Sequence, residues 1–275
     1  MHRAESPGKD SVPSLTTQLD EHGVLRLTLN RPEVHNAFDS GLIAALTAAL
    51  ERAEEDADVR IVVLSGAGAS FSAGADLNWM RKQVHASEHE NEHDALQLAR
   101  LMRRLNYLDR PSVARVNGAA FGGGVGLVAC CDIAIAADDA EFGLTESRLG
   151  LAPAVISPYV LRCIGERHAR RYFISGERFT ARQAQAIGLV HEAVPADALD
   201  QRVDALIGEL LKAGPAALRS CKRLAFSVAG HDRDAQLALD QQAARLIAAL
   251  RVSAEGQEGL TSFLEKRNPG WLTGK

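Results

Sequence analysis

Two glycine-containing segments have the composition best suited to chemistry in this chain. One is "SAGADL" at residues 72–77, and the other is "FGGGVG" at residues 121–126. Glycine lets a backbone approach a ligand closely and adopt positive φ. Two such loops could each direct a free backbone N–H into one crevice, and a pair of these donors stabilises charge developing on a carbonyl oxygen. The two loops together predict an oxyanion hole, although either loop alone would favour an ordinary tight turn.

Two other motifs suggest different chemistries. "GVGLVA" at residues 124–129 matches the GxGxxA cradle for a dinucleotide phosphate, but the helix that follows has room for only about eight residues. "HENEH" at residues 89–93 matches HExxH, in which Glu90 would be the base of a zinc site. Every residue from 87 to 94 is polar, and no third ligand follows at a suitable spacing. We therefore interpret this motif as the solvated first turn of a helix and expect no metal.

The elements that must position the two loops alternate between strands and helices. Short apolar or alternating runs predict strands. Those runs are "GVLRLTLNRP" (23–32), "VRIVVLSG" (59–66), "PSVARVNG" (111–118) and "CDIAIAAD" (131–138). Helices are expected from about residue 39 or 40, and from a capping box at Ser87 and Glu90 to about Leu108. This alternation predicts an α/β fold with a mostly parallel sheet.

The periodicity changes along the chain and predicts three regions. Residues 1–14 resemble a loose N-terminal tail without the apolar segment of a signal peptide. Residues 15–195 form the expected β/α core. After about Pro195 only amphipathic helical patterns remain, so residues 196–275 are expected to form a helical C-terminal region.

Composition excludes several classes of function. The chain has 31 Lys and Arg against 35 Asp and Glu, a net charge of −4, so no basic field favours nucleic acid. No apolar run reaches the length of about 18 residues that a membrane span needs. The four cysteines form no CxxC pair, which indicates neither a disulfide framework nor a zinc site and suits a reducing compartment. We expect a cytoplasmic protein that binds neither membrane nor nucleic acid.

Five segments occur in the order and spacing of the crotonase superfamily, the enoyl-CoA hydratase/isomerase family. They are "NRPEVHNAF", "FSAGADL", "VNGAAFGGGVGLVACCDIAIA", "AEFGLTESRLGLAP" and "FLEKRNPGW". The resemblance extends from about Leu15 to Trp271. It implies a spiral of ββα units, a helical C-terminal assembly region and a homotrimer or homohexamer. It also implies an acyl-CoA substrate with no separate cofactor, because CoA arrives as part of the thioester.

The resemblance also implies roles for individual residues. The thioester oxygen would lie between the backbone N–H groups of Ala75 and Gly123, and Glu146 in "LTESRLG" would act as the acid or base. The contacts to CoA would come from His35, Ala37, Ala73, Asp76, Leu77 and Lys266. Of these, Lys266 would reach the CoA phosphate of a neighbouring subunit.

One position departs from the family pattern. Hydratases of this family usually carry a second glutamate where this chain has Gly126. A single carboxylate could add water to a 2-enoyl-CoA, or it could move a proton between carbons as a Δ3-Δ2-enoyl-CoA isomerase does. A non-catalytic member that binds acyl-CoA or RNA is a third possibility.

A subgroup of the family narrows the substrate. "GAAFGGGVGLVACCDIAIA", "GLAPAVISPYV" and "IGERHARRY" resemble bacterial 3-methylglutaconyl-CoA hydratases of leucine breakdown. That substrate has a distal carboxylate, so a basic group in the acyl pocket would help to bind it. Proximity to the motifs suggests Arg81, Lys82 and Arg148 as candidates, without a preference among them.

Overall fold

Two sheets form the centre of the molecule. The computed structural model describes residues 13–273, so the predicted tail lies almost entirely outside the described residues. The larger sheet has six strands in the order β1-β2-β3-β5-β7-β10, and the smaller has the order β4-β6-β8-β9. The strands are β1 (Leu15–Leu19), β2 (Val24–Leu29), β3 (Ile61–Gly66), β4 (Ser70–Ser72), β5 (Ser112–Val116), β6 (Ala119–Phe121), β7 (Ile133–Ala137), β8 (Glu141–Gly143), β9 (Arg178–Thr180) and β10 (Glu192–Val194).

From β3 to β8 the chain forms a spiral in which successive strands join alternate sheets. β3, β5 and β7 are parallel neighbours in the larger sheet, and the strand after each of them joins the smaller sheet. There β4, β6 and β8 are also parallel neighbours. Their carboxyl ends therefore meet at one edge, which is where α/β folds bind ligands. The segments leaving that edge are "SAGADL", the glycine run and the turn that carries Glu146.

The helices follow the predicted order. They are α1 (Ser40–Glu55), α2 (Leu77–His85), α3 (Glu88–Asn106), α4 (Gly123–Cys130), α5 (Ser157–Ser175), α6 (Ala181–Ala186), α7 (Leu199–Leu211), α8 (Pro215–Val228), α9 (Arg233–Val252), α10 (Ala254–Leu264) and α11 (Gly270–Thr273), with 3-10 turns η1 (Pro32–Val34), η2 (Glu146–Leu149) and η3 (Ala196–Ala198). After β10 the described chain is helical, as the sequence predicted. The capping box at Ser87 and Glu90 is present, and α3 ends at Asn106.

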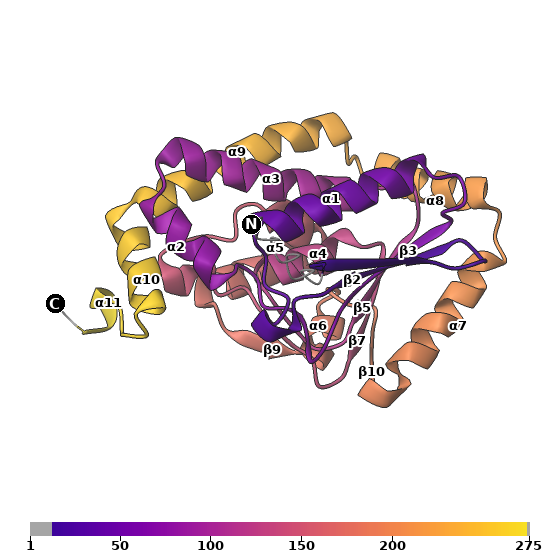
Figure 1. Cartoon of the computed structure of the whole chain (residues 1–275), viewed down its shortest axis with the longest axis horizontal. Helices are drawn as coiled ribbons and strands as arrows, with labels where there is room; N and C mark the ends of the chain where they lie inside the picture. The colour runs from indigo at the N-terminus through magenta and orange to yellow at the C-terminus, as the bar shows by residue number, and fades with distance from the viewer. Residues whose placement is uncertain (1–12, 274–275) are drawn as a thin grey trace, which may run out of the picture.

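Both faces of the larger sheet are buried, because its residues alternate between two apolar clusters. Val62 and Leu64 pack with residues of α1 and α3, whereas Ile61 and Val63 pack with Leu199 and other residues of α7. Figure 1 shows α1, α3 and α9 gathered on one side of the strands, with α7 on the other and α2 and α10 near one end. The fold is the crotonase-type α/β spiral that the sequence predicted. In the described part of the chain, no helix is long and apolar enough to cross a membrane.

Candidate active site

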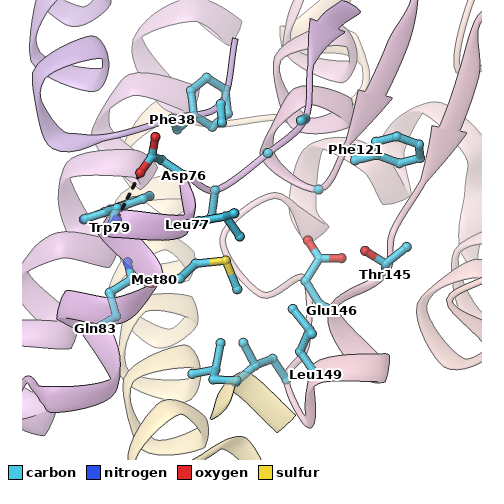
Figure 2. A pocket seen from close by; sticks show the side chains of 18 of the residues that line it. Phe38, Asp76, Leu77, Trp79, Met80, Gln83, Phe121, Thr145, Glu146 and Leu149 are labelled. Atoms are coloured by element: carbon cyan, nitrogen blue, oxygen red, sulfur yellow. Dashed lines mark hydrogen bonds between the residues drawn. The ribbon is translucent and has the colours of Figure 1, made fainter. Parts of the chain in front are cut away.

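A cavity of about 560 Å³ lies where the three segments from the smaller sheet meet. Its walls include the loop before α2, the first turn of α4, the turn η2, and parts of α9 and α10. Figure 2 shows the side chains of Trp79, Met80 and Gln83 along one wall and those of Thr145 and Glu146 along the other. The ends of the parallel strands therefore place Ala75, Gly123 and Glu146 around one cavity.

The first N–H of the predicted oxyanion hole belongs to Ala75. Ala75 pairs with Phe38 in an isolated parallel bridge. The N–H of Phe38 donates to the carbonyl of Gly74 at 2.6 Å, and the carbonyl of Phe38 accepts from the N–H of Asp76 at 2.8 Å. These bonds use the residues on either side of Ala75. Its own N–H has no hydrogen-bond partner among residues 13–273 and is available to a ligand in the cavity.

The second N–H belongs to Gly123, the first residue of α4. An N–H in the first turn of a helix has no partner within that helix. Gly122 precedes it at φ +49°. A Cβ on Gly123 would lie 2.6 Å from Cε2 of Phe38, and a Cβ on Gly122 would lie 3.0 Å from Oε1 of Glu146. These two glycines thus let a ring and a carboxylate approach the backbone where the thioester is expected.

Glu146 supplies the carboxylate of this site and is half-buried. It begins η2, and Figure 2 shows it reaching into the cavity from the wall that also carries Leu149. Its Oε2 is buried without a hydrogen-bond partner in the described structure, and no cation of that structure forms an ion pair with it. Burial raises the pKa of Glu146 from 4.5 to about 7. A carboxyl group with this pKa can both accept and donate a proton near neutral pH.

The residues predicted to contact CoA fall into two groups. Five of them line the cavity: His35, Ala37, Ala73, Asp76 and Leu77. Lys266 is exposed after the end of α10 and is not part of the cavity wall. The carboxylate of Asp76 is engaged within the protein, since it caps α2 through the N–H of Asn78 at 2.8 Å. The roles of these residues in CoA binding stay predictions.

Sequence reasoning missed the polar residues that hold the first loop in place. Arg31 donates to the carbonyl of Ala37 at 2.7 Å and forms an ion pair with Asp76 at 2.9 Å. Asn36 is buried at φ +55°, accepts from the N–H of Arg31 and donates to the carbonyl of Ser70 at 2.8 Å. Both residues lie in "NRPEVHNAF", and their polar side chains within that motif were the sequence feature that could have indicated this role. They fix the strand-like segment that leaves the N–H of Ala75 free.

The missing glutamate has a steric explanation. A Cβ on Gly126 would lie 2.3 Å from Cγ2 of Ile156 and 3.1 Å from Cε of Met102. Gly126 is buried behind Ile156, which lines the cavity itself. The side chain of Ile156 therefore already fills the space that a glutamate side chain at position 126 would need.

Of the three basic candidates for a distal carboxylate, only Arg81 lies on the cavity wall. Arg81 lines the cavity but is exposed and donates to Oδ1 of Asn78 at 2.6 Å. Lys82 and Arg148 are exposed and lie outside the cavity wall. The buried cation of the wall is instead Arg251 on α9, which is 8% exposed. Its position depends on the packing of a helix far along the chain, so proximity to the motifs did not indicate it.

The two alternative motifs have structural roles. His89 and His93 are exposed on α3, and no group of three or more His, Cys, Asp or Glu suited to a metal occurs in the described chain. Asn91, in the same motif, is fully buried, so that turn is less solvated than expected. In "GVGLVA", a Cβ on Gly124 would lie 2.6 Å from the carbonyl oxygen of Ser72. That glycine permits close packing of α4 on β4.

Comparisons with known proteins agree with this geometry. The enoyl-CoA hydratase/isomerase family model matches residues 20–274. The 2,3-dehydroadipyl-CoA hydratase of Escherichia coli is 35% identical over 248 residues, covering 90% of this chain and 94% of that protein. An enoyl-CoA hydratase structure from Shewanella pealeana is 44% identical with a TM-score of 0.76, covering 94% of this chain and 96% of the other. One from Mycobacterium avium subsp. paratuberculosis is 30% identical with a TM-score of 0.83, covering 94% and 98%. The chain belongs to the enoyl-CoA hydratase/isomerase family, and it is an enzyme of that family.

Proposed function

We propose that this enzyme adds water to a 2-enoyl-CoA through an enolate, with Glu146 as its single acid–base group. The observation that carries the proposal is that two backbone N–H groups without partners in the described structure and one carboxylate with a buried, unpartnered oxygen line the same cavity. With the thioester oxygen between Ala75 and Gly123, attack of water on the β-carbon moves negative charge onto that oxygen. Backbone donors placed in advance stabilise that charge.

In this mechanism Glu146 acts twice. Its carboxylate takes a proton from the attacking water as the new carbon–oxygen bond forms at the β-carbon. The resulting carboxylic acid then returns a proton to the α-carbon, and the enolate collapses to the thioester. A pKa of about 7 suits both steps, because neither protonation state is strongly disfavoured at neutral pH.

We propose 3-methylglutaconyl-CoA as the substrate, which would place the enzyme in leucine breakdown. The resemblance of the glycine-run segment to that subgroup supports this choice. The Escherichia coli relative is named for 2,3-dehydroadipyl-CoA, which also derives from a dicarboxylic acid. We further propose that CoA enters only with the substrate. The active form would be a cytoplasmic homotrimer or homohexamer in which exposed Lys266 reaches a neighbour's CoA phosphate.

The second candidate function is a Δ3-Δ2-enoyl-CoA isomerase. It is favoured by one observation, the packing of Ile156 over Gly126, which leaves no second glutamate there to hold water. A single carboxylate can carry a proton from C2 to C4 while the same oxyanion hole stabilises the dienolate.

The two functions change the conjugated enoyl-thioester absorbance in opposite directions. Purified protein should remove this absorbance from 3-methylglutaconyl-CoA faster than from crotonyl-CoA, because crotonyl-CoA has no distal polar group. An isomerase would instead generate the absorbance from a 3-enoyl-CoA. Fast isomerisation with negligible hydration of 3-methylglutaconyl-CoA would overturn the hydratase proposal.

A further inference from the structure

Two further residues that line the cavity each have a buried side-chain nitrogen without a hydrogen-bond partner in the described structure. These nitrogens are Nε2 of Gln83 on α2 and Nε of Arg251 on α9. Gln83 is 2% exposed and Arg251 is 8% exposed. Figure 2 shows Gln83 across the cavity from Glu146, with Met80 reaching between them. Neither atom takes part in the acid–base chemistry proposed above, so their presence needs another explanation.

Arg251 is a buried cation without a matching anion. Its Nη1 makes two contacts of 3.4 Å, both with oxygens of Asn91. No carboxylate in the described residues lies within ion-pair distance of it. Burial lowers the pKa of Arg251 to about 10, and the Coulombic influence of Asp94 offsets this only in part. The guanidinium therefore stays charged at neutral pH.

A buried charge of this kind costs stability unless another group pairs with it. Neighbouring residues nevertheless hold it in position. Asn91 donates to the carbonyl of Gln83 at 3.1 Å while its own oxygens face Arg251. Gln257 donates to the carbonyls of Val84 at 3.1 Å and Arg251 at 2.7 Å, joining the end of α9 to α2. Asn91 thus links Arg251 to the backbone of Gln83, and both residues line the cavity.

We propose that Arg251 and Gln83 form a subsite for a carboxylate at the far end of the acyl chain, an inference that rests on the proposed acyl-CoA function. A guanidinium N–H and an amide N–H can each donate to one carboxylate oxygen, and the bond from the charged guanidinium is the stronger of the two. The substrates would then be CoA monothioesters of short dicarboxylic acids. Apolar Ile247 and Leu260 also line the cavity, which suits the hydrocarbon between the two ends.

The subsite can be tested by binding alone, without relying on hydration. Glutaryl-CoA and pentanoyl-CoA are saturated and differ in the terminal carboxylate. Isothermal titration calorimetry should show glutaryl-CoA binding at least about tenfold more tightly. Arg251→Met should abolish this preference by weakening glutaryl-CoA alone, and Arg251→Lys should retain part of it. Arg245→Met is the matched control, because Arg245 is exposed on the same helix and outside the cavity wall.

Two results would overturn the subsite. One is equal affinity of the wild type for the two thioesters. The other is an Arg251→Met variant that binds both thioesters and free CoA equally weakly, which would assign Arg251 to the CoA moiety. If that variant does not fold, Gln83→Leu serves instead, with a smaller loss of preference for glutaryl-CoA. A protein that prefers glutaryl-CoA yet hydrates no enoyl-CoA would retain the subsite and refute only the hydratase function.

Discussion

Helix α9 buries one charge in each half, and the two have different surroundings. Asp240 is 1% exposed, pairs with Arg103 and accepts from Nε2 of Gln236 at 2.8 Å. Arg251, about three turns further along, is nearly as buried but has no ion-pair partner in the described chain. Asp240 faces α3 and α5, whereas Arg251 faces the cavity. Within one helix, the buried charge that lacks a partner is the one beside the space for a ligand.

Glu146 resembles Arg251 in this respect. Its Oε2 is buried on the cavity wall without a partner in the described structure. Burial raises its pKa, a backbone hydrogen bond of its own lowers the pKa by less, and no neighbouring charge contributes. Buried ionisable groups with shifted pKa values cluster at functional sites. The comparison therefore predicts that unpaired charges serve function while paired ones serve stability, and the following variants separate the two effects.

The largest effect is expected for Glu146→Gln. Glutamine keeps the shape but cannot accept or return the proton, so kcat should fall by about 10²–10⁴-fold. Acyl-CoA affinity should change little. In the wild type, kcat/KM for hydration should fall as the pH drops below about 7, since the carboxylate base becomes protonated. Steady-state kinetics across pH measures both effects.

Glu33→Gln provides the control, because Glu33 lines the cavity but is exposed. It should turn over at nearly the wild-type rate. Near-wild-type activity of Glu146→Gln would show that another group is the acid–base catalyst. Glu146 would then no longer be an example of an unpaired charge that serves function.

The next effect concerns the free N–H of Ala75. Ala75→Pro removes a donor that makes no hydrogen bond within the described fold, so we expect a loss of transition-state stabilisation of about 3 kcal/mol in kcat/KM. Ala75→Gly keeps the N–H and should stay close to wild type. A proline variant that folds with normal circular dichroism and full activity would rule out this N–H as an oxyanion donor.

Glu146→Gln should also change stability in a pH-dependent way. The folded-state pKa of about 7 lies above the unfolded value of 4.5, so the native state binds the extra proton. The contribution of Glu146 is fully present below pH 4.5 and is lost as the pH rises through 7. At pH 8 the variant should therefore be more stable by up to about 3 kcal/mol, and near pH 4 the difference should vanish. Urea denaturation at the two pH values measures this; an equal difference at both would contradict the burial of the charge.

Much of this architecture could be predicted from local sequence. The spacing of Ser87 and Glu90 indicated a helix start, and alternating β and α signals indicated the parallel sheet. The two glycine loops indicated free N–H groups, which are a backbone property and so are visible in composition. The position of Glu146 came from family resemblance, and its unpaired burial could not be foreseen because it depends on the packing around η2.

The remaining features depend on contacts between distant segments. Arg251 lies near the end of an amphipathic helix, where a basic residue is common and usually solvated. Only the packing of α9 on α2 and α3 buries it beside Gln83 and Asn91. The space behind Gly126 is likewise set by Ile156, thirty positions later in the chain. Neither of these two contacts produces a periodic pattern of residues that could be recognised in the sequence.

The smallest effect tests the two halves of α9 directly, by comparing the stabilities of two arginine-to-methionine variants. Arg103→Met leaves Asp240 buried without its cation, and the free energy of unfolding should fall by about 2 kcal/mol, less than for a fully buried pair because Arg103 is 21% exposed. Arg251→Met removes a charge that has no ion-pair partner in the described fold and only two long contacts with Asn91, so stability should be unchanged or slightly higher. Urea denaturation without ligand at pH 7 measures both. Adding glutaryl-CoA should then raise the Tm of wild type and Arg103→Met more than that of Arg251→Met. Equal destabilisation by the two substitutions would mean that contacts within the fold stabilise the charge of Arg251 as well as that of Asp240. The proposed difference between paired and unpaired charges on α9 would then be wrong.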